Sequence, residues 1–376
     1  MTTVEQLREN LCRAALREPE RRFHQLFDKL YRPDILRRAF ERACCAGGRP
    51  PGYGRGCLED TGEMLRNGVF RPHGAVFGDR VVDEALALVL EPLLLPGRRF
   101  DAWEVLGTLR DLLARSRGPV LCLKVMPDWT LCPGELLGLL ERRLADRRLL
   151  ALVRAFLAVG LRPAILDFGR LNVPRLDGGV GPLLGDYQLS VAGLLLSAGL
   201  PGLVGVVRGG NEVVLVGGDH TTDHDLAGWR DVLTGLGLTA LAVRPFATAR
   251  DGFDFMGLHW RKRSGSGEVV FQPAQAGVRA IRCCIREMTS GKTHLGLDAV
   301  VARINRPLGE WGAYYRICPH RAVMKDIDVY VRERLARFNA KKHGLSGPGL
   351  GRPEVSRRAL RELGLIELGK LPQGIN

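Results

Sequence analysis

Apolar residues recur at helical spacing through most of the first 115 residues of the chain. Leucines and phenylalanines three or four positions apart predict helices within residues 5–46. The same spacing predicts amphipathic helices at residues 79–91 and 101–114. Glycine and proline crowd residues 47–56, so a loop is expected there. The N-terminal third of the chain is therefore predicted to be helical.

Short apolar runs farther along the chain predict strands. Residues 119–126 form one such run, in which Lys124 is the only charged residue. Two β-branched runs around a Gly-Gly turn predict a hairpin within residues 204–217, and a last short strand is expected at residues 269–271. Helices are expected between and after these strands, at residues 135–159, 226–236 and beyond about 275. This order of elements predicts an α+β fold.

One uncharged stretch has the length of a membrane span. Residues 187–207 contain no charged residue, but Pro201 and several glycines interrupt them. We therefore expect a buried helix, a turn and a strand there. The N-terminus lacks the features of a secretory signal, and the nine cysteines are odd in number and include two adjacent pairs. These features predict a cytoplasmic protein with thiols rather than disulfides and without a membrane partner.

The chain is strongly basic, with 55 Lys and Arg against 41 Asp and Glu and a net charge of +14. Much of the excess lies in residues 301–376, which hold 15 Lys and Arg against 7 Asp and Glu. Such a balance points to a polyanionic partner, most simply nucleic acid. Aromatic residues make up only 6% of the chain, which argues against a platform of stacked bases as the main binding mode.

One heptapeptide, Asp-His-Thr-Thr-Asp-His-Asp, has the composition of a metal site. His220 and His224 are four residues apart and could share one face of a helix around a metal ion. No acid-base residue accompanies them in a protease-like pattern. We therefore favour a solvated helix start that Thr221, Thr222 or Asp223 caps. The nucleophile motif Gly-x-Ser-x-Gly does not occur in the sequence.

Several segments resemble, in the right order, parts of the reverse transcriptase/maturases that group II introns encode. The resemblance covers about residues 20–345, and it lies in residues 80–92, 135–160, 178–184, 250–261 and 305–344. Its last two segments, residues 250–261 and 305–344, are specific to this family among polymerases, and the second contains the run Gly-Glu-Trp-Gly-Ala-Tyr-Tyr at 309–315. The resemblance implies a right-hand polymerase fold with N-terminal helices and reduced fingers at residues 1–115, a palm with an antiparallel sheet at 116–272, a helical maturase-type thumb at 273–345 and a C-terminal tail at 346–376. No His-Asn-His nuclease pattern follows the thumb.

The main departures from the family concern the catalytic centre. The family holds two Mg²⁺ ions with three palm carboxylates, one in a strand and two in a Tyr-Ala-Asp-Asp turn. The matching positions read Lys124, Asn211 and Glu212, so one carboxylate of three remains and a cation stands where a metal ion would bind. This comparison predicts no bound Mg²⁺ and no intact catalytic residue. Lys124 could equally be a strand lysine whose amine reaches solvent, which is no metal ligand either.

Other segments that contact the substrate in the family are also altered in this chain. Asp177, Gly178 and Gly179 represent the template-contacting turn, one residue short and with Asp in place of Gln. Residues 68–79 compress a longer hairpin of the fingers, and Arg244 stands where the family has lysine. The nucleotide pocket, the template turn and the metal site are thus all altered, whereas the scaffold and the thumb are not.

The thumb carries the residues that we expect to contact RNA. Trp311 and Tyr315 lie four residues apart among many cations, where they could pack the core of the thumb or stack on bases. The cations would neutralise phosphates, although some are expected to be solvated bystanders. The predicted RNA-binding residues are Arg303, Arg306, Tyr314, Arg316, Arg321, Lys325, Arg332, Arg334, Arg337, Lys341 and Lys342.

These features lead to the hypothesis of a catalytically inactive, maturase-like protein. It would bind a structured RNA, such as a group II intron, and stabilise the fold of that RNA during splicing. A scaffold whose palm binds a protein partner, such as an active reverse transcriptase or a defence complex, fits the altered metal site equally well. A residual RNA-directed DNA polymerase that uses Asp128, Glu212 or Asp219 is a further alternative. The product of a decaying gene is the last.

Overall fold

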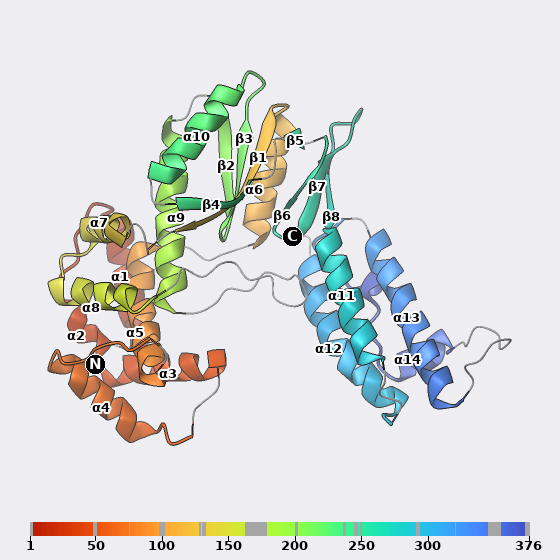
Figure 1. Ribbon diagram of the computed structural model, residues 1–376, viewed down its shortest axis with the longest axis horizontal. Coiled ribbons are helices and arrows are strands. Elements are labelled where there is room, and N and C mark those ends of the chain that lie inside the picture. Colours follow the sequence, from red (N-terminus) through yellow and green to blue (C-terminus); the bar gives the residue numbers. More distant parts are fainter. Residues whose placement is uncertain are drawn as a thin grey trace. The chain divides into compact units, whose positions relative to one another are not determined.

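A computed structural model of the chain (Figure 1) consists of helices and antiparallel sheets, which confirms the predicted α+β class. It describes residues 3–47, 51–74, 76–97, 102–127, 129, 133–161, 179–199, 202–235, 238–243, 247–248, 250–290, 294–319, 321–344 and 355–372. The chain divides into two compact units, the first comprising residues 1–105, 123–166 and 176–244 and the second the remainder. The polymerase fold and the division into fingers, palm, thumb and tail stay predictions.

The first unit is built around one buried helix, α5 (Phe77–Leu94). Apolar side chains occupy nearly every face of this helix, so α1, α3 and α9 can all pack against it. The other helices of the unit are α1 (Val4–Arg17), α2 (Phe27–Leu30), α3 (Pro33–Gly47), α4 (Arg55–Arg66), α7 (Pro133–Arg143), α8 (Arg147–Ala158), α9 (Val180–Gly199) and α10 (Asp223–Gly235). The helices predicted within residues 5–46 and at 79–91 are confirmed.

A single carboxylate, Asp146, joins two segments of this unit that are distant in sequence. Its Oδ1 accepts hydrogen bonds from the N–H groups of Arg148 and Leu149 at 3.1 and 3.2 Å and so caps α8. Its Oδ2 accepts from the N–H groups of Leu26 and Phe27, both at 2.8 Å, where α2 begins. Burial alone would raise the pKa of Asp146, but these four donors hold it below its ordinary value. The ionised carboxylate therefore fixes the start of α2 to α8.

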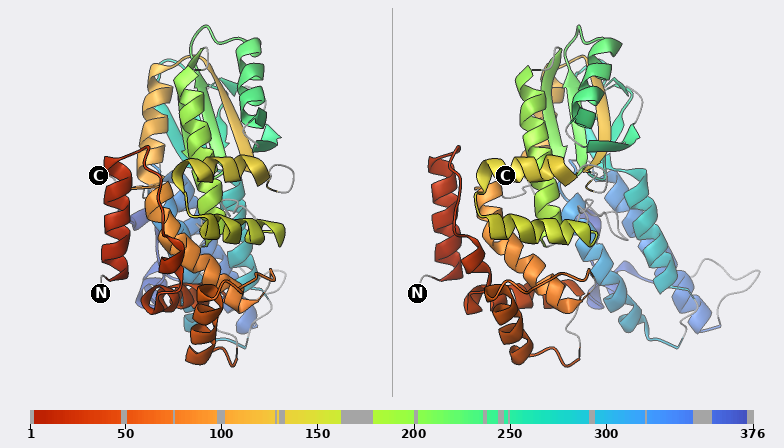
Figure 2. Two further views of the ribbon diagram at one scale, coloured as in Figure 1. Left: turned by 90° about the vertical axis from the view of Figure 1, so that its left-hand side faces the viewer. Right: turned by 60° about the vertical axis from the view of Figure 1, so that its left-hand side comes forward.

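A sheet lies against helices α9 and α10 (Figures 1 and 2). Its strands are β1 (Pro119–Pro127), β2 (Leu203–Gly209), β3 (Glu212–Gly217), β4 (Leu238–Val243) and β5 (Ala247–Thr248). They are ordered β2-β3-β1-β4, and the short β5 also pairs with β1. The β2–β3, β1–β4 and β1–β5 pairs are antiparallel. The predicted strand at residues 119–126 and the predicted hairpin at 204–217 are confirmed, whereas β4 and β5 were not predicted.

The uncharged stretch at residues 187–207 is divided between α9 and β2. Helix α9 ends at Gly199 and β2 begins at Leu203, as the interrupting proline and glycines predict. Tyr187, Leu189 and Ala192 are buried within the first unit. Among the helices that the structure describes, none combines the length and the apolar character needed to cross a bilayer.

The second unit combines a small antiparallel sheet, ordered β6-β7-β8, with helices. Met256 and Gly257 form the turn between β6 and β7, with φ angles of 51° and 69° that fit a type I′ hairpin turn. Lys262 in β7 donates to three carbonyls at the end of α6, at 2.8, 3.2 and 2.9 Å, and so caps that helix. The elements are α6 (Ala102–Arg115), β6 (Phe253–Phe255), β7 (Leu258–Lys262), β8 (Val269–Pro273), α11 (Gln275–Met288), α12 (Leu297–Tyr315), α13 (Ala322–Lys342), α14 (Arg357–Glu362) and the 3₁₀ turn η1 (Leu368–Lys370).

Helices α11, α12 and α13, called the helical bundle below, enclose buried aromatic side chains. Trp311 and Tyr315 have no exposed surface, and their ring centroids are 4.3 Å apart. The indole Nε1 of Trp311 donates to the carbonyl of Gly277 on α11 at 3.2 Å. Of the two roles considered for these rings, the structure supports packing of the bundle core over stacking on bases.

Residues 355–372, called the C-terminal segment below, pack against the helical bundle. The two carboxylate oxygens of Asp328 on α13 accept from the N–H groups of Leu368 and Gly369, both at 2.8 Å. The side-chain amide of Asn305 on α12 likewise pairs with two backbone groups of the segment, at 2.8 and 2.9 Å. This part of the predicted tail is therefore an integral part of the second unit.

Candidate nucleic-acid interface

The three positions that the resemblance assigns to the metal site lie close together in the first unit. Lys124 belongs to β1, and Asn211 and Glu212 lie at the turn between β2 and β3. The N–H group of Val125 donates to the carbonyl of Asn211 at 2.9 Å, which places this turn directly beside β1. The fold therefore assembles one local site from strands that are about 85 residues apart in sequence.

The described side chains of this site are one lysine, one asparagine and one glutamate. Lys124 is half-buried next to a register shift between β1 and β4, and its ammonium group makes no hydrogen bond or ion pair with a described residue. Asn211 is buried and follows Gly210, whose φ of +61° fits the first central position of a type II′ turn. Within the described part of the chain, no group of three His, Cys, Asp or Glu side chains is arranged to hold a metal ion.

The heptapeptide with two histidines forms the start of α10. The N–H and hydroxyl groups of Thr222 both donate to Oδ2 of Asp225 at 2.8 Å, and the N–H of Asp225 donates back to Thr222 Oγ1 at 3.3 Å. This reciprocal pair is a capping box with Asp at its third helical position. The predicted threonine cap is confirmed at Thr222. The side chain of His224 lies outside the described residues.

Only part of the predicted template turn is described. Asp177 and Gly178 lie outside the described residues, as does Arg244, whereas Gly179 leads into α9. Gly179 has a φ of +99°, and a Cβ atom built on it would lie 2.2 Å from Oδ2 of Asp83. The other oxygen of Asp83 accepts from the N–H of the first residue of α9 at 3.2 Å. The positive φ and the close approach to the half-buried carboxylate of Asp83 therefore favour glycine at position 179.

Burial of Asp83 predicts a stability that falls as the pH rises. Burial raises the pKa of Asp83 from 3.8 to about 7, so between these values the unfolded chain loses a proton that the folded chain keeps. The free energy of unfolding should then fall by up to about 1.4 kcal/mol per pH unit and by about 2–4 kcal/mol in all. Urea unfolding of Asp83→Asn between pH 4 and 8 should show a flatter profile than the parent chain.

Two features make this measurement specific. Burial also raises the pKa of Glu84, the neighbouring carboxyl on α5, so a residual slope of the same sign should remain in the variant. Asp60 on α4 is exposed, and Asp60→Asn should leave the profile unchanged. If Asp83→Asn kept the slope of the parent chain, the titration of Asp83 would not be its cause.

The predicted RNA-binding residues of the helical bundle fall into two groups. The exposed group is Arg303, Arg306, Arg316, Lys325, Arg337 and Lys341. Of these, Arg306 and Arg337 pair with a glutamate one turn away on the same helix, at 3.3 and 3.7 Å, and the others have no partner among the described residues. Exposed ion pairs of this kind are weak, so all six cations remain available to phosphates.

The second group already has partners within the second unit. Arg334 donates to the last turn of α11, and Lys342 donates to the carbonyl before α12 at 2.7 Å. Arg321 reaches a carbonyl of the C-terminal segment at 3.4 Å, and Arg332 is half-buried beside that segment. The hydroxyl of Tyr314 donates to the carbonyl of the β6–β7 turn at 2.6 Å. The structure thus gives these five residues a packing role, and their contact with RNA stays a prediction.

Three arginines of α11 were not among the residues predicted to bind RNA. Arg279, Arg282 and Arg286 are exposed and recur at spacings of three and four residues, which places them on one helix face. The guanidinium of Arg282 lies 5.4 Å from the ring centre of Tyr330 on α13, whose hydroxyl donates to the Arg282 carbonyl at 3.3 Å. The spacing was visible in the sequence, but the pairing of α11 with α13 was not.

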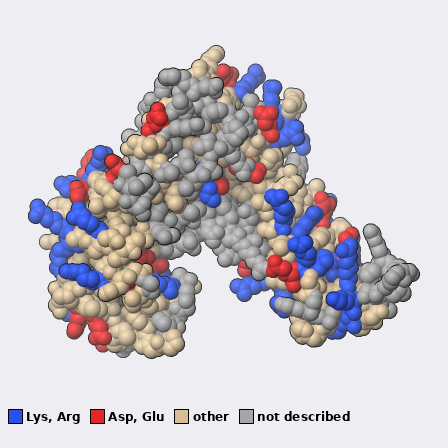
Figure 3. Space-filling model, in the orientation of Figure 1, with Lys and Arg blue, Asp and Glu red and all other residues tan. Residues whose placement is uncertain are grey.

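Cations of α11 and α13 form one surface, called the basic face below. It consists of Arg279, Arg282, Arg286, Arg334, Arg337 and Lys341. Arg282 lies beside Tyr330, and Arg334 donates to the carbonyl of Arg286 at 3.2 Å, so the two helices run parallel and align their cations. Lys and Arg side chains gather over these helices in Figure 3. Such a surface suits a polyanion whose strands lie side by side.

The helical bundle also carries a similarity to a known family. Residues 278–351 match the family described as the group II intron, maturase-specific domain. The match includes nearly all of α11 and the whole of α12 and α13, and it includes no residue of the first unit. No curated protein matches the chain. The match supports the maturase family for the part of the chain that bears the basic face.

Proposed function

We propose that this chain is a maturase-type protein that binds group II intron RNA and stabilises its folded state. The proposal rests on the basic face, which lies within the segment that matches the maturase-specific domain. Several cations on two parallel helices can neutralise phosphates that a folded RNA brings together. A protein that binds only the folded RNA favours that form by RT ln(1 + [protein]/Kd).

The first unit, on this proposal, keeps the sheet of a polymerase palm without its chemistry. Lys124 and Asn211 supply no anionic ligand, and a lysine ammonium opposes the binding of a divalent cation on Coulomb grounds. Template-directed incorporation of a labelled nucleotide should therefore be undetectable with Mg²⁺ or Mn²⁺. Incorporation that Glu212→Ala abolished would contradict this part of the proposal and support a residual polymerase.

Charge reversal on the basic face should weaken RNA binding strongly. Arg279, Arg337 and Lys341 are the suitable positions, because all three are exposed and form no hydrogen bond or ion pair with another helix among the described residues. Replacing all three with Glu should lower the affinity for a structured group II intron RNA on the order of 100-fold and reduce the salt slope of log K by about 3. Filter binding over a series of salt concentrations measures both quantities, and circular dichroism checks the fold.

A matched control tests whether the position of the charges matters. Arg357→Glu, Arg358→Glu and Lys370→Glu in the C-terminal segment change the net charge equally within the same unit. This control should keep most of the affinity, and an equal loss in both variants would mean diffuse attraction rather than a binding face. Sequencing of RNA cross-linked to the chain in its own cell, with both variants in parallel, would identify the RNA. If no RNA were enriched over the charge-reversed variant, the proposed function would be wrong.

A further inference from the structure

Residues 66–74 of the first unit follow helix α8 from its first turn to its end. At the first turn, Nη2 of Arg148 donates to the carbonyl of Arg66 at 3.2 Å. At the end of the helix, a Cβ atom built on Gly74 would lie 3.3 Å from the carbonyl oxygen of Val159. The segment and the helix therefore lie side by side. Their exposed side chains form one surface, called the α8 surface below, which consists of Arg66, Val69, Arg71, Arg147, Ala151, Arg148, Arg154 and Val159.

The α8 surface is cationic and has no carboxylate of its own. Residues 66–74 and 147–161 contain five arginines, all of them exposed, and no Asp or Glu. None of the five arginines forms an ion pair with a described residue. Asp146, directly before α8, already accepts four backbone N–H groups. The positive charge of this surface is therefore left for a partner to neutralise.

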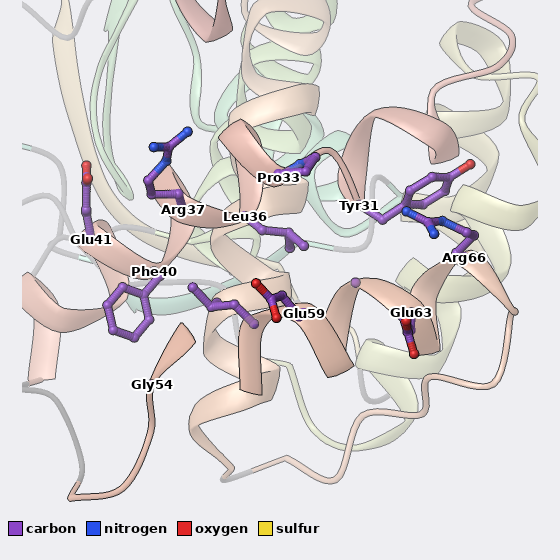
Figure 4. Close-up of a pocket in the computed structure, with 12 residues that line it drawn as sticks. Tyr31, Pro33, Leu36, Arg37, Phe40, Glu41, Gly54, Glu59, Glu63 and Arg66 are labelled. Atoms are coloured by element: carbon purple, nitrogen blue, oxygen red, sulfur yellow. The ribbon is translucent and has the colours of Figure 1, made fainter. Parts of the chain in front are cut away.

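Two pairs of arginines present this charge in different ways. Arg147 and Arg154 are seven residues apart, so they share one face of α8 at a distance of about 10 Å. The other two rest on aromatic rings. The guanidinium of Arg66 lies over the ring of Tyr31, 5.5 Å from its centre (Figure 4), and that of Arg148 lies 4.2 Å from the ring centre of Phe27. These ring contacts orient the two guanidinium groups and supply no negative charge to them.

Exposed apolar side chains lie among these arginines. Val69 and Val159 are 59% and 40% exposed, at opposite ends of the α8 surface. Beneath them, the buried rings of Phe70 and Phe156 pack with centroids 6.4 Å apart and join the segment to the helix. Phosphates would complement the arginines but would leave the valines in water. A peptide that carries both carboxylates and apolar side chains complements both kinds of residue.

We propose that the α8 surface binds an acidic, amphipathic segment of a partner protein. Asp or Glu side chains of that segment pair with Arg147 and Arg154, and its apolar side chains cover Val69 and Val159. Arginine suits such an interface, because its planar guanidinium binds a carboxylate through two hydrogen bonds. The inference goes beyond RNA binding, since it gives the first unit a protein partner.

Selection from a displayed peptide library tests the proposal on the full chain. Peptides of about 15 residues are long enough to span α8 as a helix. The enriched peptides should combine Asp or Glu with apolar residues. One of them, synthesised with a fluorescent label, should bind Arg147→Glu/Arg154→Glu at least about tenfold more weakly than the parent chain. Val69→Ser/Val159→Ser keeps the net charge and should weaken binding at least about threefold. Circular dichroism checks the fold of each variant.

The matched control is Arg13→Glu/Arg17→Glu, which reverses two exposed arginines of α1 and changes the net charge equally. This variant should bind the peptide within about twofold of the parent chain. Enriched peptides without acidic residues, or equal binding by all the variants, would overturn the proposal. Displacement of the peptide by a structured RNA would also overturn it, because the α8 surface would then bind RNA. Since none of these substitutions touches the basic face, RNA binding should persist in every variant, and the two proposals can fail separately.

Discussion

Asp328→Ala should release the C-terminal segment from the helical bundle and lower the free energy of unfolding of the second unit by about 3 kcal/mol. The carboxylate of Asp328 accepts two backbone N–H groups of the segment, both at 2.8 Å. Alanine would leave both donors without an acceptor in a buried place, and each such loss costs about 1–3 kcal/mol. Water reaches the donors only if the segment leaves the bundle. Trypsin cleavage after Arg357 and Arg358 and urea unfolding measure the two effects.

Asp326→Ala is the matched control for this substitution. Asp326 lies on the same helix two residues earlier, and it is exposed. Its replacement should change the unfolding free energy by about 0.5 kcal/mol or less and leave the rate of cleavage unchanged. Equal cleavage rates in Asp328→Ala and Asp326→Ala would mean that the two hydrogen bonds do not hold the segment in place.

Trp311→Ala should destabilise the helical bundle by about 4 kcal/mol. The indole has no exposed surface, packs on Tyr315 with ring centroids 4.3 Å apart and donates to the carbonyl of Gly277 at 3.2 Å. Alanine removes this volume and the hydrogen bond of the indole to the Gly277 carbonyl. Because a chain of two units need not unfold in one step, hydrogen exchange of the amides of α11, α12 and α13 is the suitable measurement.

Trp103→Ala is the control, because it removes the same side chain as Trp311→Ala from a more exposed position. Trp103 on α6 is 36% exposed, so its removal creates a smaller cavity and should cost about 1–2 kcal/mol. Faster exchange confined to the bundle amides of Trp311→Ala would support the packing role. Equal protection of those amides in the two variants would show that Trp311 does not support the bundle core.

Long amphipathic segments of this protein were predictable because burial of one helix face requires a periodic sequence. The predicted helix at residues 79–91 and the observed α5 (Phe77–Leu94) differ only at their ends. Strands β5 and β6 were not predicted, since they span two and three residues and are too short for an alternating pattern. Their pairing partners, rather than their own sequences, define them.

The docking of the C-terminal segment was not predictable for a related reason. Its contacts depend on Asp328 and Asn305, which meet backbone groups about 40 and 60 residues away. The type of the residue that supplies a backbone group does not indicate whether that group is hydrogen-bonded. In the sequence, Asn305 stood out only through the resemblance to a family, and Asp328 did not stand out at all.

The candidate site was predictable where it depends on residue type and unpredictable where it depends on the pairing of helices. The resemblance placed Lys124, Asn211 and Glu212 as neighbours, and β1 does lie beside the β2–β3 turn. Arg334 was predicted only to contact RNA, yet it donates to the last turn of α11. Basic residues on a helix look alike in sequence whether they face solvent or a neighbouring helix.

The attachment of the C-terminal segment affects how the protein folds during its synthesis on the ribosome. Asp328, whose carboxylate accepts from the N–H group of Leu368, is synthesised 40 residues before Leu368. At about 5–20 residues per second, translation leaves this side of the nascent bundle uncovered for about 2–8 s. During that interval the face that the segment will cover is open to chaperones and to other nascent chains. Slow codons between positions 328 and 368 would lengthen this exposure, so the speed of translation there should affect the yield of folded protein.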